Sequence, residues 1–214
     1  NLDRTIRGGD IQFKSDWVDA TVFGGEVKWY EFVDNQSENT YEEREINDEL
    51  FGGHIGFSLM NFAEIDLNYV SGTIYDFIRS TEVEEDFQTY SGSVEMNGLF
   101  NGYIDFYAEY GKLMWDDDDV FGYEAEDGEA LYSSLTGYLG DFTIFAEYKD
   151  YDYWDYRYGR PPTADREDEA SEIDDIKGFR VKLDYYSIAT DTLIYFSYGS
   201  FDNQGHPDSL GNVS

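Results

Sequence analysis

The chain has 214 residues and a formal net charge of -33 at pH 7, from 47 Asp and Glu against 14 Lys and Arg. Such an excess of negative charge argues against a nucleic-acid partner, because binding phosphates depends on basic residues that release counterions. The absence of Cys excludes a disulfide scaffold and a thiolate metal site, and without an apolar run of about 18 residues any membrane crossing must use strands.

The composition favours strands over helices. The chain contains 20 Tyr, 16 Phe and 21 Gly but only 3 Pro, which suits many strands joined by turns. No shift in composition divides the chain, so we expect one β-barrel domain over 1–214, or a fragment of one. In chain order, the predicted strands are 10–17, 20–32, 51–59, 63–75, 87–96, 102–115, 130–138, 142–151, 177–186 and 192–201.

The segment Gly102–Trp115 is the clearest of these strands. At period two, Ile104 and Phe106 fall on one side, and Asp105 and Glu109 fall on the other. A helix would place the two acids on one face among aromatic residues, so the alternation favours a strand.

The connections between the predicted strands alternate between short turns and longer acidic segments. More than half of the Asp and Glu residues fall in four predicted loops, which are 34–50, 79–88, 115–129 and 150–177. In an antiparallel up-and-down arrangement, this alternation gathers the short turns at one end and the long loops at the other. Together with the alternating strands it predicts an all-β fold, an antiparallel up-and-down transmembrane β-barrel of about ten strands.

The orientation of the faces follows from the bulk of the apolar side chains. A barrel of about ten strands could not readily enclose so many aromatic residues, so we expect the apolar face to meet lipid. Trp17, Trp29, Trp115 and Trp154 lie near predicted strand ends, as in an aromatic belt. The alternative is a soluble barrel or sandwich with an apolar interior.

The opposite face is then predicted to line a lumen. It mixes acids and bases, which either select cations through an excess of acid or pair with each other and fill the interior. The predicted lumen-lining residues are Lys14, Glu26, Lys28, Asp66, Glu95, Asp105, Glu109, Glu147, Lys149, Arg180, Lys182 and Asp184.

One segment carries a resemblance to known proteins. Residues 137–170 read GYLGDFTIFAEYKDYDYWDYRYGRPPTADREDEA, a tight turn, a strand ending in AEYKDYD, and a loop with PPT and an acidic stretch. This resembles a group of porin-like outer-membrane β-barrel proteins of Gram-negative bacteria. The resemblance implies a fold and a location but no reaction. Such barrels often end on an aromatic residue, whereas this chain ends SLGNVS, so we expect it to be part of a larger barrel.

The acidic loops have two interpretations. They form either a solvated anionic surface or a site for a hard cation such as Ca²⁺, which takes several carboxylate oxygens. No known Ca²⁺-binding loop spacing is present, and the candidate ligands are Asp116, Asp118, Glu126 and Asp127. We expect no other cofactor.

Catalysis is not expected. His54 and His206 are the only histidines, and neither lies in a motif for nucleophilic or metal chemistry.

The leading hypothesis is therefore a passive, porin-like channel of the bacterial outer membrane for small polar or cationic solutes. Its partners would be the lipid bilayer and these solutes, with envelope proteins or a homo-oligomer as further possibilities. The second hypothesis is a non-conducting barrel that serves as a surface scaffold or envelope-complex subunit through its acidic loops. The third is a soluble β-barrel that binds an apolar ligand.

Overall fold

The computed structural model describes most of the chain. The described ranges are 5–35, 40–59, 62–78, 81–116, 119–120, 123–124, 127–154, 176–187 and 190–203. Within them, only the backbone is described for 5–6, 29–35, 40–46, 76–78, 81–83, 119–120, 123–124 and 203.

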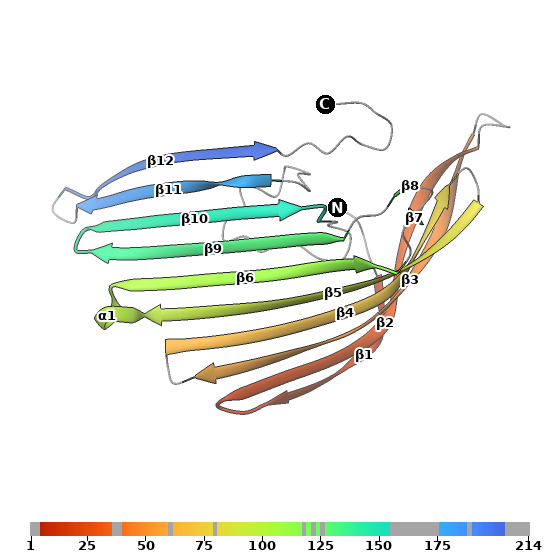
Figure 1. The fold of residues 1–214 in the computed structure, drawn as a ribbon, viewed down its shortest axis with the longest axis horizontal. Coiled ribbons are helices and arrows are strands. Elements are labelled where there is room, and N and C mark those ends of the chain that lie inside the picture. The colour runs from red at the N-terminus through yellow and green to blue at the C-terminus, as the bar shows by residue number, and fades with distance from the viewer. Residues whose placement is uncertain are drawn as a thin grey trace.

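The described residues form one antiparallel sheet of ten strands in the order β1-β2-β3-β4-β5-β6-β9-β10-β11-β12 (Figure 1). The strands are β1 (Thr5–Lys14), β2 (Val18–Asn35), β3 (Thr40–Leu59), β4 (Ala63–Ile78), β5 (Thr81–Gly98), β6 (Ile104–Trp115), β9 (Gly128–Leu139), β10 (Phe142–Asp152), β11 (Ile176–Ser187) and β12 (Thr192–Asn203). Two further strands, β7 (Asp119–Val120) and β8 (Tyr123–Glu124), pair only with each other. The predicted all-β, antiparallel up-and-down fold is confirmed.

Each strand of this sheet pairs with the strand that follows it among the ten, so no crossover occurs. Within the described residues, β1 and β12 form the two edges of a curved, open sheet (Figure 1). Because ten strands alternate in direction, these two edge strands run antiparallel to each other.

The short connections lie at one end of the sheet, here called the turn end, and the opposite end is called the loop end. At the turn end, β5 passes into β6 through the four-residue element α1 (Leu99–Gly102). Gly98, Phe100, Asn101 and Gly102 all have positive φ, so α1 is a left-handed tight turn rather than a helix. Gly98, the last residue of β5, therefore begins this connection.

In two of the predicted loops, the residues that the structure describes belong to strands. Residues 40–50, inside the predicted loop 34–50, belong to β3 and pair with β2 as far as Asn35 opposite Thr40. Residues 81–88, inside the predicted loop 79–88, belong to β5, which pairs with β4 as far as Ile78 opposite Thr81. The two hairpins extend past the neighbouring strands at the loop end (Figure 1). Acidic composition does not prevent pairing where two adjacent strands supply backbone partners.

The register divides the sheet into an apolar face and a polar face. Residues directly opposite each other on paired strands point to the same side, so one face can be followed from β1 to β12. The apolar face carries Ile11, Phe13, Val22, Ile55, Phe57, Ile65, Leu67, Val94, Phe106, Leu131, Leu135, Ile144, Val181, Leu183, Phe196 and Tyr198.

The polar face is traced by one row of paired positions across all ten strands. This row is Lys14, Asp19, Gly56, Asp66, Ser93, Glu109, Tyr132, Lys149, Gly178 and Phe201. The predicted alternation of faces is therefore present, and it is in phase across the whole sheet.

Strand β2 corrects two of the predicted lumen positions. Val22 pairs with Ile11 and lies on the apolar face, so Glu26 and Lys28, four and six residues later, lie on that side too. Phe23 and Val27 instead lie on the polar face, where the Phe23 ring covers Gly52 on β3. The alternation within β2 follows from its sequence, but the prediction of which of its two sides joins the polar face of the sheet was wrong. Only the register between paired strands decides that assignment.

Candidate functional site

The apolar face is exposed to its surroundings rather than packed against another layer. Among the described side chains, Ile11 is 80% exposed and Leu67 is 50% exposed, although both lie within paired strands. The exposed residues continue through Leu135, Val181 and Phe196 to the far edge. Monomeric water-soluble proteins rarely expose an apolar surface of this extent, so it needs an apolar environment.

Tyrosines and then charged residues follow the apolar band toward the loop end. Tyr69, Tyr90 and Tyr110 lie on neighbouring strands and are all partly exposed. Lys112 lies directly opposite Tyr90 on the same face, and its Nζ is 3.4 Å from Asp127. Along β6 the order on this face is thus Phe106, then Tyr110, then Lys112.

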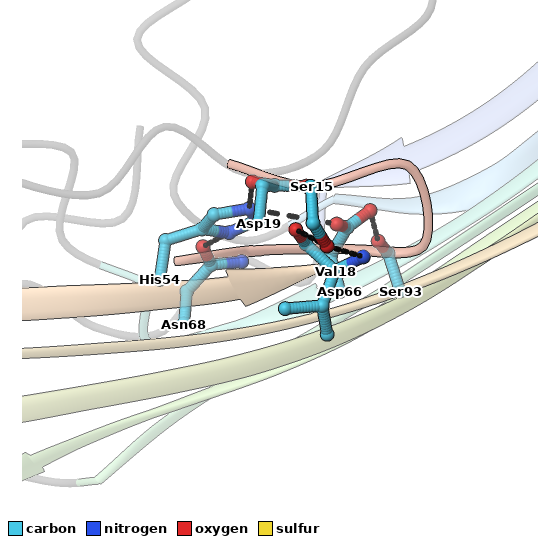
Figure 2. Close-up of polar contacts among 7 residues, drawn as sticks. All are labelled: Ser15, Val18, Asp19, His54, Asp66, Asn68 and Ser93. Atoms are coloured by element: carbon cyan, nitrogen blue, oxygen red, sulfur yellow. Dashed lines mark hydrogen bonds and ion pairs between the residues drawn. The ribbon is translucent and has the colours of Figure 1, made fainter. Parts of the chain in front are cut away.

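The polar face holds a network of side chains near the turn end, shown in Figure 2. His54 on β3 lies between two acceptors, with Nδ1 2.9 Å from Asn68 Oδ1 and Nε2 2.9 Å from Asp19 Oδ2. Asn68 in turn donates from Nδ2 to Ser91 Oγ at 3.1 Å. The network therefore joins β2, β3, β4 and β5 side by side.

A second carboxylate approaches the same histidine. Asp66 Oδ1 lies 3.7 Å from His54 Nε2, and Asp66 Oδ2 accepts a hydrogen bond of 3.2 Å from Ser93 (Figure 2). Gly56 separates the two acids in the row, and a Cβ there would lie 2.6 Å from Asp19 Oδ1 and 2.8 Å from Asp66 Oδ1. The missing side chain at Gly56 allows both carboxylates to converge on His54.

Strands β10 and β11 bring charges of both signs to the same face. Arg180 Nη2 lies 2.6 Å from Glu147 Oε1, and the Glu147 side chain is fully buried. Tyr132 on β9 donates from its hydroxyl to Glu147 Oε2 at 3.1 Å. Lys149, also buried, lies with its Nζ over the Phe201 ring at 5.7 Å from the ring centre. Burial of such charges is tolerable because each has a protein partner.

Toward the loop end the polar face becomes apolar. The buried residues there, here called the apolar cluster, are Ile74, Phe87, Leu113, Ala130, Tyr132, Tyr151 and Trp154. Trp115 packs beside this cluster, with its ring 6.1 Å from that of Phe87.

Trp154 is brought into the apolar cluster by the way the chain leaves β10. Tyr153 has a φ of 48°, and the backbone there lies close against Gly128 on β9. The Trp154 ring covers Gly111 on β6, where an added Cβ would lie 2.7 Å from Trp154 Cη2. Two positions without side chains, Gly111 and Gly128, thus make room for this segment on the polar face.

These positions correct the predicted aromatic belt. Trp154 is only 4% exposed and Trp115 lies beside it on the polar face, so neither belongs to an outward-facing belt. Trp17 is 66% exposed at the turn end, and the side chain of Trp29 lies outside the described residues. Tyr69, Tyr90 and Tyr110 occupy the place expected for the tryptophans.

Apart from Glu26 and Lys28, all predicted lumen-lining residues share the polar face. They are Lys14, Asp66, Glu95, Asp105, Glu109, Glu147, Lys149, Arg180, Lys182 and Asp184. Whether this face lines a lumen stays a prediction. Sequence reasoning missed the network of Asp19, Asn68 and His54. His54 lies on the polar face, and its partners are 14 and 35 residues away in the chain, a separation that the spacing of residues along one strand does not reveal.

The predicted cation ligands are not brought together in the described structure. Asp116 accepts a hydrogen bond from Gln88 on β5, and Asp127 pairs with Lys112. Asp118 and Glu126 lie outside the described residues. Among the side chains that are described, no group of three or more His, Asp or Glu residues could hold a metal ion.

Comparison of the chain with protein-family models, with curated proteins and with solved structures finds no match. The resemblance of residues 137–170 to porin-like proteins therefore stays a prediction. In the part of the chain that the structure describes, no helix is long and apolar enough to cross a membrane.

Proposed function

We propose that the chain forms the wall of a bacterial outer-membrane β-barrel, which acts as a passive channel for small polar or cationic solutes. The observation that carries this proposal is the exposed apolar face that runs across the sheet from β1 to β12. A surface of this kind is stable against acyl chains, and strands can cross a bilayer when all backbone groups are paired within a closed sheet.

The order of side chains along the apolar face supports a membrane location. Transmembrane barrels have an apolar band bordered by aromatic residues at the level of the lipid headgroups. Here Leu67 is followed by Tyr69, the neighbouring strands contribute Tyr90 and Tyr110, and Lys112 lies at the level of Tyr90. The lipid-facing charges thus lie where headgroups and water would meet them.

The polar face supports a wet interior. Charges of both signs share one side of the sheet, which would be costly in hydrocarbon but is tolerated beside water or a protein partner. Acids predominate on β2 to β6, whereas Lys149, Arg180 and Lys182 gather on β10 and β11. A small polar solute that moves along this face would find hydrogen-bonding partners throughout.

The proposal requires that the edges β1 and β12 are paired. Their antiparallel directions fit closure with an even number of strands, by each other or through further pairs of strands. Pairing also satisfies the backbone N–H and C=O groups that the outer sides of these two edge strands would otherwise leave without partners.

A second candidate is a non-conducting outer-membrane barrel that serves as a scaffold. It is favoured by the apolar cluster, since Trp154 and its neighbours cover the polar face near the loop end. Such a barrel would present its acidic connections to envelope proteins.

Recordings from the purified protein in a planar lipid bilayer test the channel. We expect discrete single-channel currents, and their absence from protein that is shown to be folded would leave the scaffold as the better proposal. Folding is checked by electrophoresis in detergent, where a barrel migrates differently before and after heating. Partition into the aqueous phase of a detergent extraction would contradict both membrane proposals.

A further inference from the structure

The ionic state of His54 can be argued from its hydrogen-bond partners. Its Nδ1 faces Asn68 Oδ1 and its Nε2 faces the Asp19 carboxylate, both at 2.9 Å. In the structure Asn68 Nδ2 donates to Ser91 Oγ, and Asn68 Oδ1 faces the imidazole ring. A neutral imidazole has one N–H donor, whereas the imidazolium has two. The geometry therefore fits a positively charged His54.

This positive charge lies between two carboxylates. Asp19 on β2 and Asp66 on β4 approach His54 Nε2 to 2.9 Å and 3.7 Å (Figure 2). On β1, Lys14 lies directly opposite Asp19 in the row. The other acids on the polar face of the neighbouring strands are Glu64 on β4, Glu95 on β5 and Glu109 on β6. Among the described positions on β2, β3 and β4 at this level, His54 supplies the positive charge.

The group is also accessible to a solute. The side chains of His54, Asp19 and Asp66 are 31%, 35% and 24% exposed, so they are neither sealed in a core nor fully solvated. Because Gly56 has no side chain, the two carboxylates occupy the space beside it on the polar face. A cation passing along this face would meet the two acids directly if His54 were neutral.

We propose that His54 determines the ion selectivity of the channel, because its imidazolium occupies the Asp19–Asp66 pair and its deprotonation frees that pair to attract cations. This inference rests on the proposed function. His is the side chain whose charge ordinarily changes between about pH 5 and pH 8. Cation selectivity is therefore expected to rise with pH.

The test compares the wild-type protein with His54→Gln in planar bilayers under a KCl gradient at pH 5 and pH 9. One unit charge near the path of an ion changes its local concentration about two- to fivefold. We expect the K⁺ to Cl⁻ permeability ratio of the wild type to rise by this factor between the two pH values. His54→Gln is expected to keep a high ratio at both, and His206→Gln, which alters the other histidine of the chain, to behave as the wild type.

A second measurement reads the histidine itself. In the His206→Gln protein, His54 is the remaining imidazole, so its ¹⁵N chemical shifts can be followed by NMR during a pH titration. We expect both ring nitrogens to be protonated at pH 5. Asp19→Asn should move the titration midpoint to lower pH, because it removes the carboxylate that favours the charged form.

The outcomes separate the two proposals. Currents with the same pH dependence in the wild type and in His54→Gln would overturn the role of His54 and leave the channel intact. A neutral His54 at pH 5 would overturn it as well. Absence of current from folded protein would overturn the proposed channel and, with it, this inference.

Discussion

The two ends of the polar face follow the same alternation but differ in what they bury. Near the turn end, His54, Asp66 and Asn68 remain partly exposed and hold each other through hydrogen bonds. Near the loop end, Phe87, Leu113 and Trp154 are buried in an apolar cluster. The first end is held by polar contacts between neighbouring strands, and the second by a segment that folds back onto the sheet. One face of a strand can thus pass from solvent-exposed to buried surroundings while its side chains keep the same two-residue alternation.

The largest effect is expected from Trp154→Ala, which would remove the ring that completes the apolar cluster. Loss of a buried aromatic side chain costs about 4 kcal/mol in the free energy of unfolding. Urea unfolding in detergent micelles, followed by tryptophan fluorescence and circular dichroism, measures this change. Trp17→Ala at the exposed turn end is the matched control, and an equal loss in both variants would contradict a special role for Trp154.

Arg180→Met tests the buried ion pair between Arg180 and Glu147, which Tyr132 of the apolar cluster also contacts. It would leave the buried Glu147 carboxylate without its ionic partner at 2.6 Å, which costs about 3 kcal/mol. Lys177→Met is the control, because Lys177 pairs with Asp150 at a more exposed position. The double variant Arg180→Met/Glu147→Leu should recover part of the lost stability. Failure to recover any would mean that Arg180 acts through packing rather than charge.

Gly111→Ala asks how closely Trp154 is held to the sheet. The added methyl group would overlap the Trp154 ring, and overpacking of this kind costs about 2 kcal/mol. Gly137→Ala is matched to it, since a Cβ at Gly137 meets only the Ile144 carbonyl oxygen at 4.0 Å. The comparison would break down if both alanine variants unfolded at the same urea concentration.

Asn68→Ala gives the smallest of these effects, because the turn-end network is partly exposed. It removes the acceptor of His54 Nδ1 and the donor to Ser91, with an expected loss of about 1 kcal/mol. The exposed Ser58 on the same face provides the control variant Ser58→Ala. A loss as large as that of Trp154→Ala would show that the two ends contribute equally to stability.

The strands themselves could be predicted with few errors. The alternation in Ile104–Trp115 or Ile176–Ser187 is a property of neighbouring residues, and it indicates a two-sided strand before any partner is known. The predicted loops 34–50 and 79–88 are wrong for their described residues, because acidic composition indicates exposure to solvent but does not exclude strand pairing. The backbone hydrogen bonds between β2 and β3, and between β4 and β5, form whether or not the side chains there are acidic.

The candidate site was predicted in part. Arg180, Glu147 and Asp66 were assigned to one face from their spacing alone, and the register agrees. Glu26 and Lys28 were assigned to the wrong side, and the burial of Trp154 over Gly111 was not foreseen. These errors concern contacts between strands that are distant in sequence, for which period-two alternation carries no information.

The sequence by itself therefore determined that the chain consists of long strands with one apolar and one polar side, because side-chain direction alternates along any strand. Only the tertiary structure decided which residues meet across strands, as His54 does with Asp19 and Trp154 with Gly111. The physical reason is that register is set jointly by paired strands, whereas alternation is set within each strand.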